Sequence, residues 1–190
     1  HVLKETSDEP LAEFRRGNVE AIIDLAKQAL EAGVKRFVFV SSIGVNGNST
    51  VESSFTEKSV PAPHADYAIS KLEAEQGLLA MLKNITMKLV IVRPPLVYAA
   101  NAPGNFSKLL KLVASSIPLP FGSVRNQRSM IALENLADFI VLCTMHPNAA
   151  NQLFLVSDGV EFSISEIMKY LGEEIKKKTR IIPMPVCLLR

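Results

Sequence analysis

A tyrosine and a lysine lie four residues apart in the stretch DYAISKLEAE, residues 66 to 75. Positions four apart share one face of a helix, so a helix here would bring Tyr67 and Lys71 together. A phenol with a pKa of about 10 is a poor base at neutral pH. A nearby ammonium favours the ionised phenol and lowers that pKa. The pair could therefore exchange a proton with a substrate hydroxyl, although the same spacing also occurs in surface pairs without chemistry.

Two serines add a third reactive group earlier in the chain. Ser41 and Ser42 end the stretch VKRFVFVSS, which predicts a buried parallel strand because both of its faces are apolar. Open α/β sheets place their ligands at the carboxyl ends of such strands. If the helix with Tyr67 packs beside this strand, a hydroxyl, a phenol and an ammonium converge. This arrangement suits proton transfer that accompanies hydride transfer to or from a cofactor.

These groups depend on alternating helices and strands for their positions. Apolar residues recur at helical spacing from Asn18 to Leu30, and Gly33 follows as a stop signal. The stretch MKLVIVR, residues 87 to 93, repeats the buried-strand pattern before two prolines end it. Helices that alternate with apolar strands predict an α/β fold with a parallel sheet. The further expected elements are a strand at 151–157 and helices at 66–82, 105–116, 134–146 and 163–178, the last with a capping box at Ser163 and Glu166.

Composition restricts the classes of function. The 190 residues are 48% hydrophobic and 21% charged, with a formal net charge of +2. Mixed-sign charge does not favour nucleic-acid binding, and no apolar run is long enough to span a membrane. The two cysteines, Cys143 and Cys187, lack the spacing of a zinc site and are expected to fill the core. We therefore expect a cytoplasmic protein with no metal, no nucleic-acid partner and no membrane insertion.

A phosphate-binding loop is the element that this alternation lacks. Nucleotide-binding α/β folds cradle pyrophosphate on a glycine-rich turn between the first strand and its helix. Gly44 and Gly47 form a close pair, but they follow a strand in mid-sheet and do not open a helix. The chain also opens in polar sequence without a methionine. We therefore expect a piece of a longer protein, whose N-terminal strands and glycine-rich loop lie upstream of His1.

Several motifs together resemble the extended short-chain dehydrogenase/reductases, in particular the NAD-dependent nucleotide-sugar epimerase/dehydratase family. FVFVSSIGVNG is similar to the family's strand-end motif, with Asn46 where tyrosine is common and Gly44 where some members carry a second hydroxyl. YAISKLEAE matches the family's Tyr-x-x-Ser-Lys helix. The resemblance continues in family order through RPPLVY, APGNF, PLPFG, QRSMIALENLADFI and NQLFLVSDG, to near residue 160. Within the family, it is nearest to UDP-sugar 4-epimerases and 4-ketoreductases of bacterial polysaccharide pathways.

The resemblance implies a Ser-Tyr-Lys triad in this chain. Ser42 would orient the substrate oxygen, and Tyr67 would be the acid or base. Lys71 would tune Tyr67 and bind the nicotinamide ribose. Ser42, Tyr67 and Lys71 would thus all line the cofactor site, and Ser42 would also contact the substrate. The implied cofactor is NAD, and NADP stays open because the residues that select between them lie outside this sequence.

Five further residues are implied as ligand contacts. Asn18 would lie near the cofactor, and the Pro95 backbone would lie beside the nicotinamide ring. Asn105 would bond the substrate diphosphate, Arg128 would clamp that anion, and Phe121 would line the site of the nucleotide base. Plain structural roles compete with three of these: Asn18 as a helix N-cap, Pro95 as a strand terminator and Arg128 as a solvated charge.

The implied fold is the second half of a doubly wound, Rossmann-like parallel sheet with a small substrate-binding lobe. Residues 1–100 would be the C-terminal part of the cofactor domain and 101–190 the lobe, with a helix and strand at about 134–156 returning to the cofactor domain. The whole enzyme would oxidise or reduce C4 of a UDP-hexose, as an epimerase or a 4-ketoreductase, and would form a homodimer. The alternatives are a non-catalytic nucleotide-sensing member of the fold, or an inactive fragment as the isolated chain.

Overall fold

The computed structural model describes residues 9–50, 53–99, 105–115, 117–185 and 187. It shows a mixed α/β chain that divides into two compact units. The first unit comprises His1–Pro95 and Leu136–Val156, and the second comprises Leu96–Asn135 and Ser157–Arg190. The chain therefore passes from one unit to the other three times.

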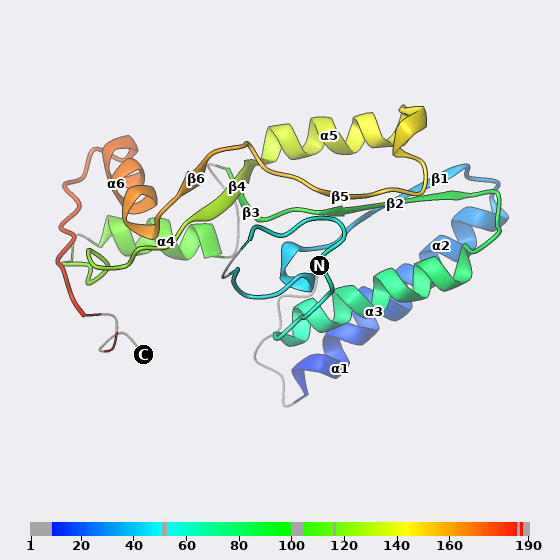
Figure 1. Ribbon diagram of the computed structural model, residues 1–190, viewed down its shortest axis with the longest axis horizontal. Coiled ribbons are helices and arrows are strands. Elements are labelled where there is room, and N and C mark those ends of the chain that lie inside the picture. The colour runs from blue at the N-terminus through cyan, green and yellow to red at the C-terminus, as the bar shows by residue number, and fades with distance from the viewer. Residues whose placement is uncertain (1–8, 51–52, 100–104, 116, 186, 188–190) are drawn as a thin grey trace. The chain divides into compact units, whose positions relative to one another are not determined.

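A three-stranded parallel sheet forms the centre of the first unit (Figure 1). Strand β1 (Arg36–Val40) pairs with β2 (Lys88–Arg93), and β2 pairs with β5 (Leu153–Leu155). The register aligns Val40 with Val92, so β1 and β2 run side by side to the carboxyl end of β1. Strand β2 is buried over all but its first residue, which explains why its sequence is apolar on both faces. The predicted buried parallel strands are confirmed.

Two helical segments cover one face of this sheet (Figure 1). The first is a continuous run of α1 (Pro10–Arg15), the π-helical turn η1 (Arg16–Glu20) and α2 (Ala21–Glu31). It ends before Gly33, whose φ of 77° favours glycine. The second is α3 (Asp66–Met81), which packs against η1 and α2. The predicted glycine stop and the second helix are confirmed, whereas the first helical run begins earlier than predicted.

The core of the first unit lies between these helices and the sheet. Its buried members come from α2, α3, β1, β2 and the turns beside them, and they include Phe39, Leu78 and Ile91. Gly77 allows α2 and α3 to approach closely, because a Cβ there would lie 2.9 Å from Cδ1 of Ile23. Burial of apolar surface contributes about 25 cal/mol per Å², so this core is the main stabilising contact around the candidate site.

Helix α5 (Leu133–Met145) lies on the opposite face of the sheet and leads through the short turn η3 (Pro147–Ala149) into β5 (Figure 1). Phe139 of α5 and Phe154 of β5 make an edge-to-face contact with ring centroids 5.3 Å apart. Cys143 is buried, as predicted. Cys187 is exposed, so the prediction of a core position for it was wrong, because local apolarity does not by itself decide burial.

The second unit contains a smaller sheet and a pair of packed helices. Strand β3 (Leu96–Tyr98) runs parallel to β4 (Arg128–Ala132), which pairs antiparallel with β6 (Glu161–Phe162). Helix α4 (Asn105–Ala114) packs against α6 (Ile164–Glu174). The apolar contact between these helices is built on Val113, Leu119 and Met168.

Helix α6 begins with the predicted capping box. The Ser163 hydroxyl oxygen accepts from the Glu166 N–H at 3.2 Å. The Glu166 carboxylate in turn accepts from the Ser163 N–H at 2.7 Å. These bonds satisfy two backbone donors that a helix start otherwise leaves without partners.

One carboxylate ties together the segments at which the chain enters or leaves the second unit. Asp158 accepts from the Tyr98 hydroxyl and from the Asn135 amide, each at 2.8 Å. It also accepts from the Ala132 N–H at 2.9 Å. The bond from Asn135, with those from Tyr98 and Ala132, holds the pKa of Asp158 below its usual value. The ends of β3 and β4, the start of α5 and the segment after β5 are thus fixed to one another.

Candidate active site

Helix α3 carries Tyr67 and Lys71 on one face. It begins at Asp66, whose carboxylate suits the positive end of the helix dipole, and the preceding Ala65 has an extended backbone. Pro63 disfavours an earlier helix start, because the residue before a proline avoids helical backbone angles. Tyr67 is half-buried and Lys71 is 7% exposed, so this face points toward protein rather than solvent.

The Lys71 ammonium reaches the end of strand β1. Its Nζ donates to the carbonyl oxygen of Val40 at 3.0 Å and lies 4.7 Å from the centre of the Phe39 ring. The centre of the Tyr67 ring is 5.8 Å from the same nitrogen. Burial lowers the pKa of Lys71 to about 8, and the Glu75 carboxylate partly opposes this shift. The side chain therefore titrates close to neutral pH.

The Tyr67 ring packs edge-on against Phe14 of α1, with ring centroids 5.7 Å apart. Burial raises the pKa of Tyr67 above its usual value. The predicted lowering of this pKa is therefore wrong, because burial disfavours the charged phenolate. The raised pKa favours the protonated phenol, the form that donates a proton.

Ser42 lies in the turn that follows β1. Its backbone is extended, and its Oγ accepts from the Gly44 N–H at 3.1 Å, which caps the short helix η2 (Ile43–Val45). Gly44 lies directly against α3, because a Cβ there would be 3.3 Å from the Cβ of Ala68. Since Ala68 follows Tyr67, the structure brings the turn with Ser42 beside the start of α3.

Asn18 lies in the π-helical turn η1 and is 4% exposed. Its amide donates to the Ser70 hydroxyl at 3.1 Å, and that hydroxyl donates to the Tyr67 carbonyl oxygen at 2.8 Å. The N-cap interpretation is wrong, because Asn18 is inside a continuous helical run rather than at its start. π-Helical turns are frequent at functional sites, and this one directs Asn18 toward the helix that carries Tyr67.

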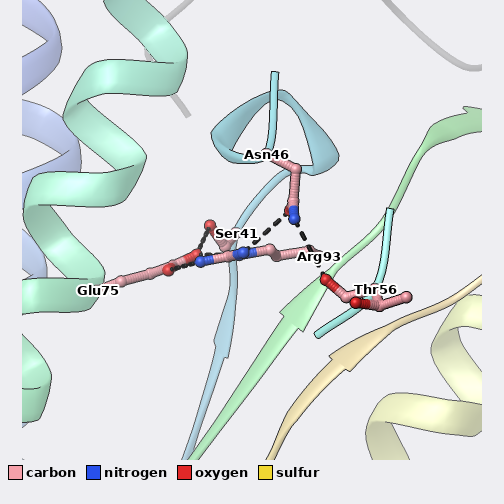
Figure 2. A network of polar contacts seen from close by, with 5 residues as sticks. All are labelled: Ser41, Asn46, Thr56, Glu75 and Arg93. Atoms are coloured by element: carbon pink, nitrogen blue, oxygen red, sulfur yellow. Dashed lines mark hydrogen bonds and ion pairs between the residues drawn. The ribbon is translucent and has the colours of Figure 1, made fainter. Parts of the chain in front are cut away.

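A buried polar network joins α3 to the ends of β1 and β2 (Figure 2). Arg93 donates to the Glu75 carboxylate from Nε at 2.9 Å and from Nη2 at 2.5 Å. The Ser41 hydroxyl donates to the same carboxylate at 2.5 Å. Arg93 Nη1 donates to Oδ1 of Asn46 at 2.9 Å, and the Asn46 amide contacts the Thr56 carbonyl oxygen at 3.5 Å. The sequence had drawn attention to Ser41 and Asn46, but not to Glu75, Arg93 or Thr56.

Two signals in the sequence could have revealed this network. Arg93 is a charged residue at the end of an otherwise apolar strand, and Glu75 is a carboxylate one helical turn after Lys71. Both are buried, and a buried charge requires a partner. Asn46, which replaces the tyrosine common in the resembling motif, is also buried and is an acceptor for Arg93.

The other predicted ligand contacts lie at the end of the first unit or in the second. Pro95 is half-buried and follows β2. Asn105 is the first residue of α4, and its side chain lies outside the described part of the structure. Phe121 is half-buried against the apolar cluster of the second unit, and Arg128 is exposed at the start of β4. The ligand roles of these residues stay predictions.

Two searches were negative over the residues that the structure describes. No group of three or more His, Cys, Asp and Glu side chains in those ranges is placed to hold a metal ion. No helix within the same ranges is long and apolar enough to cross a membrane. Helix α3, the longest uninterrupted α-helix of the described part, has 16 residues.

Comparison with protein families gives a match over most of the chain. The family of NAD dependent epimerases and dehydratases matches residues 3–156. The chain belongs to this family. The matched range contains the strand end with Ser42 and the helix with Tyr67 and Lys71. The resemblance inferred from the motifs is therefore confirmed.

Curated relatives include a UDP-glucose 4-epimerase of Vibrio cholerae. It is 46% identical over 188 residues, which are 98% of this chain and 57% of that protein. The chain spans about half the length of the curated relatives that it matches. The chain therefore corresponds to only part of such a relative.

Solved structures show the same fold. A dTDP-glucose 4,6-dehydratase from Streptomyces venezuelae, solved with NAD bound, has a TM-score of 0.78 and 21% identity. The match covers 98% of this chain and 59% of the dehydratase chain. A UDP-glucose 4-epimerase from Thermotoga maritima, solved with UDP-glucose, has a TM-score of 0.74 and 20% identity. The match covers 97% of this chain and 63% of the epimerase chain. The predicted Rossmann-like architecture is confirmed.

Proposed function

We propose that Ser42, Tyr67 and Lys71 are the catalytic triad of an NAD-dependent nucleotide-sugar enzyme that oxidises or reduces C4 of a UDP-hexose. The observation that carries the proposal is the 3.0 Å hydrogen bond from Lys71 to the Val40 carbonyl. This bond joins the helix that carries Tyr67 to the last residue of β1. Ser42 lies two residues after that strand end. One edge of the parallel sheet thus presents a hydroxyl, a phenol and an ammonium.

Tyr67 is assigned the proton transfer. Its phenol gives a proton to O4 when a 4-ketone is reduced, and its phenolate takes the proton from O4 when the alcohol is oxidised. The raised pKa of Tyr67 keeps the phenol protonated before the reduction. Ser42 holds O4, because an Oγ that accepts from the Gly44 N–H still has its own proton to donate.

The nicotinamide of NAD, when bound, accepts or returns the hydride at C4. The residues described here fit the ribose beside it. An ammonium has three N–H donors, and the Val40 carbonyl takes one from Lys71, so others suit ribose hydroxyls. Asn18 and the Pro95 backbone are the further proposed NAD contacts, with NADP as the alternative cofactor.

The second unit is proposed to bind the UDP portion of the substrate. The exposed guanidinium of Arg128 suits a diphosphate, Phe121 offers an aromatic surface to the base, and Asn105 adds an amide donor. The 46% identical relative is named a UDP-glucose 4-epimerase, which supports both the UDP-hexose and the C4 position.

The same relative favours an epimerase over a 4-ketoreductase. The test supplies the full-length enzyme with UDP-glucose and NAD in one assay, and with a UDP-4-keto sugar and reduced cofactor in another. Interconversion of UDP-hexoses without net cofactor consumption supports the epimerase. Stoichiometric cofactor consumption supports the ketoreductase. If neither reaction occurs, the proposed function is wrong.

Retention of Ser42, Tyr67 and Lys71 argues against a non-catalytic, nucleotide-sensing member of the fold. Such a protein would have no need of the buried ammonium of Lys71, which costs desolvation energy. The isolated chain is nevertheless proposed to be inactive. Within the described residues, no glycine-rich turn joins a strand directly to a helix in the way that would cradle pyrophosphate.

A homodimer and a cytoplasmic location complete the proposal. Leu25 of α2 is 52% exposed and Leu79 of α3 is 55% exposed, on two helices that pack against each other. Exposed leucines on neighbouring helices suit a helical dimer interface. Sedimentation of the full-length enzyme and of Leu79→Glu tests this: a dimer that the substitution converts to a monomer is expected, and a monomeric wild type contradicts it.

A further inference from the structure

The Glu75–Arg93 ion pair is almost completely removed from water. The side chains of Glu75 and Arg93 are 2% and 4% exposed. Three elements meet at the pair: α3 through Glu75, the end of β1 through Ser41, and the end of β2 through Arg93 (Figure 2). The loop after β1 joins through Asn46. Each link is a hydrogen bond with a preferred direction, so the network constrains orientation as well as separation.

Stability alone does not explain such a pair. Desolvation of two charges offsets much of their attraction, and apolar side chains of similar volume are often equally stabilising. Apolar contacts, however, tolerate small rotations and shifts of a helix, whereas a two-point guanidinium–carboxylate contact does not. The ion pair therefore fixes the orientation of α3 against β1 and β2, which apolar residues could not do.

The members of this network are close neighbours of the proposed triad. Ser41 directly precedes Ser42, and Glu75 lies one helical turn after Lys71 on the same side of α3. The Lys71 ammonium and the Glu75 carboxylate therefore contact the end of β1 from successive turns of one helix, at Val40 and Ser41. A rotation of α3 that broke one contact would also disturb the other.

We propose that Glu75 and Arg93 are positioning residues of the active site. Their ion pair sets the rotation of α3 and the path of the chain after β1, and thereby the places of Tyr67 and Ser42 around the sugar oxygen. The inference rests on the proposed function, because it assigns the pair a part in the reaction of that triad. Neither residue is proposed to contact substrate or cofactor.

The same pair affects the charge of Lys71. Burial lowers the pKa of Lys71, and the Glu75 carboxylate acts in the opposite direction. Loss of the Glu75 charge is therefore expected to lower the pKa of Lys71 further, so that the ammonium loses its proton at lower pH. The groups around the ammonium are Tyr67 and Glu75 on its own helix, the Phe39 ring and the Val40 carbonyl on β1, and Arg93 of β2, which is bound to Glu75.

The double variant Glu75→Leu/Arg93→Met tests positioning without leaving an unpaired buried charge. The kcat and KM for the sugar-nucleotide reaction are measured on the full-length enzyme, together with the melting temperature. We expect a folded protein whose kcat is lower by about tenfold or more, with KM within about threefold of the wild type. A smaller loss of kcat, or a loss explained by KM, overturns the inference, because the pair is then structural only.

Glu75→Gln and Glu73→Gln form a matched pair on the same helix. Glu73 accepts three hydrogen bonds from Arg15 of α1, of 3.2, 2.8 and 2.6 Å, at partly exposed positions. In Glu75→Gln the alkaline limb of the kcat profile should move to lower pH by about half a unit or more, and in Glu73→Gln it should not move. An unmoved limb in Glu75→Gln overturns the inference.

Ser41→Ala tests the positioning role if neither Glu75 variant folds. It deletes one bond to the carboxylate and changes no charge, and we expect kcat to fall by about threefold or more. An unchanged kcat overturns the inference. Assays of the wild type and of Tyr67→Phe distinguish failure of the positioning inference from failure of the proposed function. If the wild type is inactive, or Tyr67→Phe is fully active, the proposed function itself is wrong.

Discussion

Lys71 and Val40 are joined by a hydrogen bond of 3.0 Å between the middle of helix α3 and the last residue of strand β1. The donor is a buried ammonium and the acceptor is a backbone carbonyl, so the bond depends on the placement of both elements. Hydrogen bonds to charged groups contribute about 1.5–3 kcal/mol to stability. The bond offsets part of the desolvation cost of Lys71 and holds the ammonium beside the Tyr67 ring.

Tyr67→Phe is expected to abolish turnover in the full-length enzyme. The substitution removes the hydroxyl that exchanges a proton with O4 but keeps the ring that packs against Phe14. General acid–base catalysis contributes about 10²–10⁴-fold, so kcat should fall by at least that order while the affinity for the UDP-sugar changes little. Steady-state kinetics and calorimetric binding give the two quantities. An active variant would remove Tyr67 from the mechanism.

Lys71→Met is expected to remove a pH dependence of stability. The pKa of Lys71 is about 8 in the folded protein, below the ordinary value of 10.5. Between these values the unfolded chain binds more protons, so the free energy of unfolding rises with pH, by up to about 3 kcal/mol. The contribution of Lys71 to the free energy of unfolding is fully present at a pH above its ordinary pKa. It is lost as the pH falls through the pKa of Lys71 in the folded protein.

Urea unfolding of the wild type and of Lys71→Met, at about pH 7 and about pH 10, measures this difference. Other groups, including Tyr67, titrate in both proteins, so the comparison isolates Lys71. The wild type should gain stability relative to the variant at the higher pH. Equal pH dependence in the two proteins would show that Lys71 is not desolvated in the way described.

Leu78→Ala is expected to destabilise the first unit by about 2–5 kcal/mol, because it leaves a cavity in the core between α3 and the sheet. Leu78 is fully buried, whereas Leu142 of α5 is 51% exposed. Leu142→Ala is therefore the matched control and should change stability by less than about 0.5 kcal/mol. Similar effects of the two substitutions on the urea midpoint would contradict the described packing of α3.

The isolated 190-residue chain is expected to bind NAD weakly and to turn over no substrate. Its described residues provide contacts for the ribose beside the nicotinamide but no glycine-rich turn of the kind that holds pyrophosphate. Isothermal calorimetry with NAD measures the affinity, and the full-length enzyme is the positive control. Micromolar affinity of the isolated chain would contradict this expectation.

Much of the fold was predictable from local patterns. Apolar strands that alternate with helices predicted the parallel sheet of β1, β2 and β5. Such strands lack polar residues because both of their faces are buried. The capping box at Ser163 and the stop at Gly33 were also predictable, since each depends on residues a few positions apart. The spacing of Tyr67 and Lys71 likewise placed them on one helical face.

What depended on contacts distant in sequence could not be predicted in this way. The bond between Asn18 and Ser70 spans 52 positions, and that between Arg93 and Asn46 spans 47. The N-cap interpretation of Asn18 was local and was wrong for that reason. The same applies to the pKa of Tyr67, which is raised by burial among elements such as α1 that are distant in the sequence.

The sequence by itself determined the α/β class, the family and the candidate residues Ser42, Tyr67 and Lys71, because periodicity and short motifs are local properties of a chain. Only the tertiary structure decided which side chains meet at the ends of β1 and β2. Glu75 and Arg93 are ordinary charged residues in sequence, and they become an ion pair excluded from water only when α3 packs on the sheet. Burial and hydrogen-bond partners are properties of the folded chain, and the environment of a functional group follows from them.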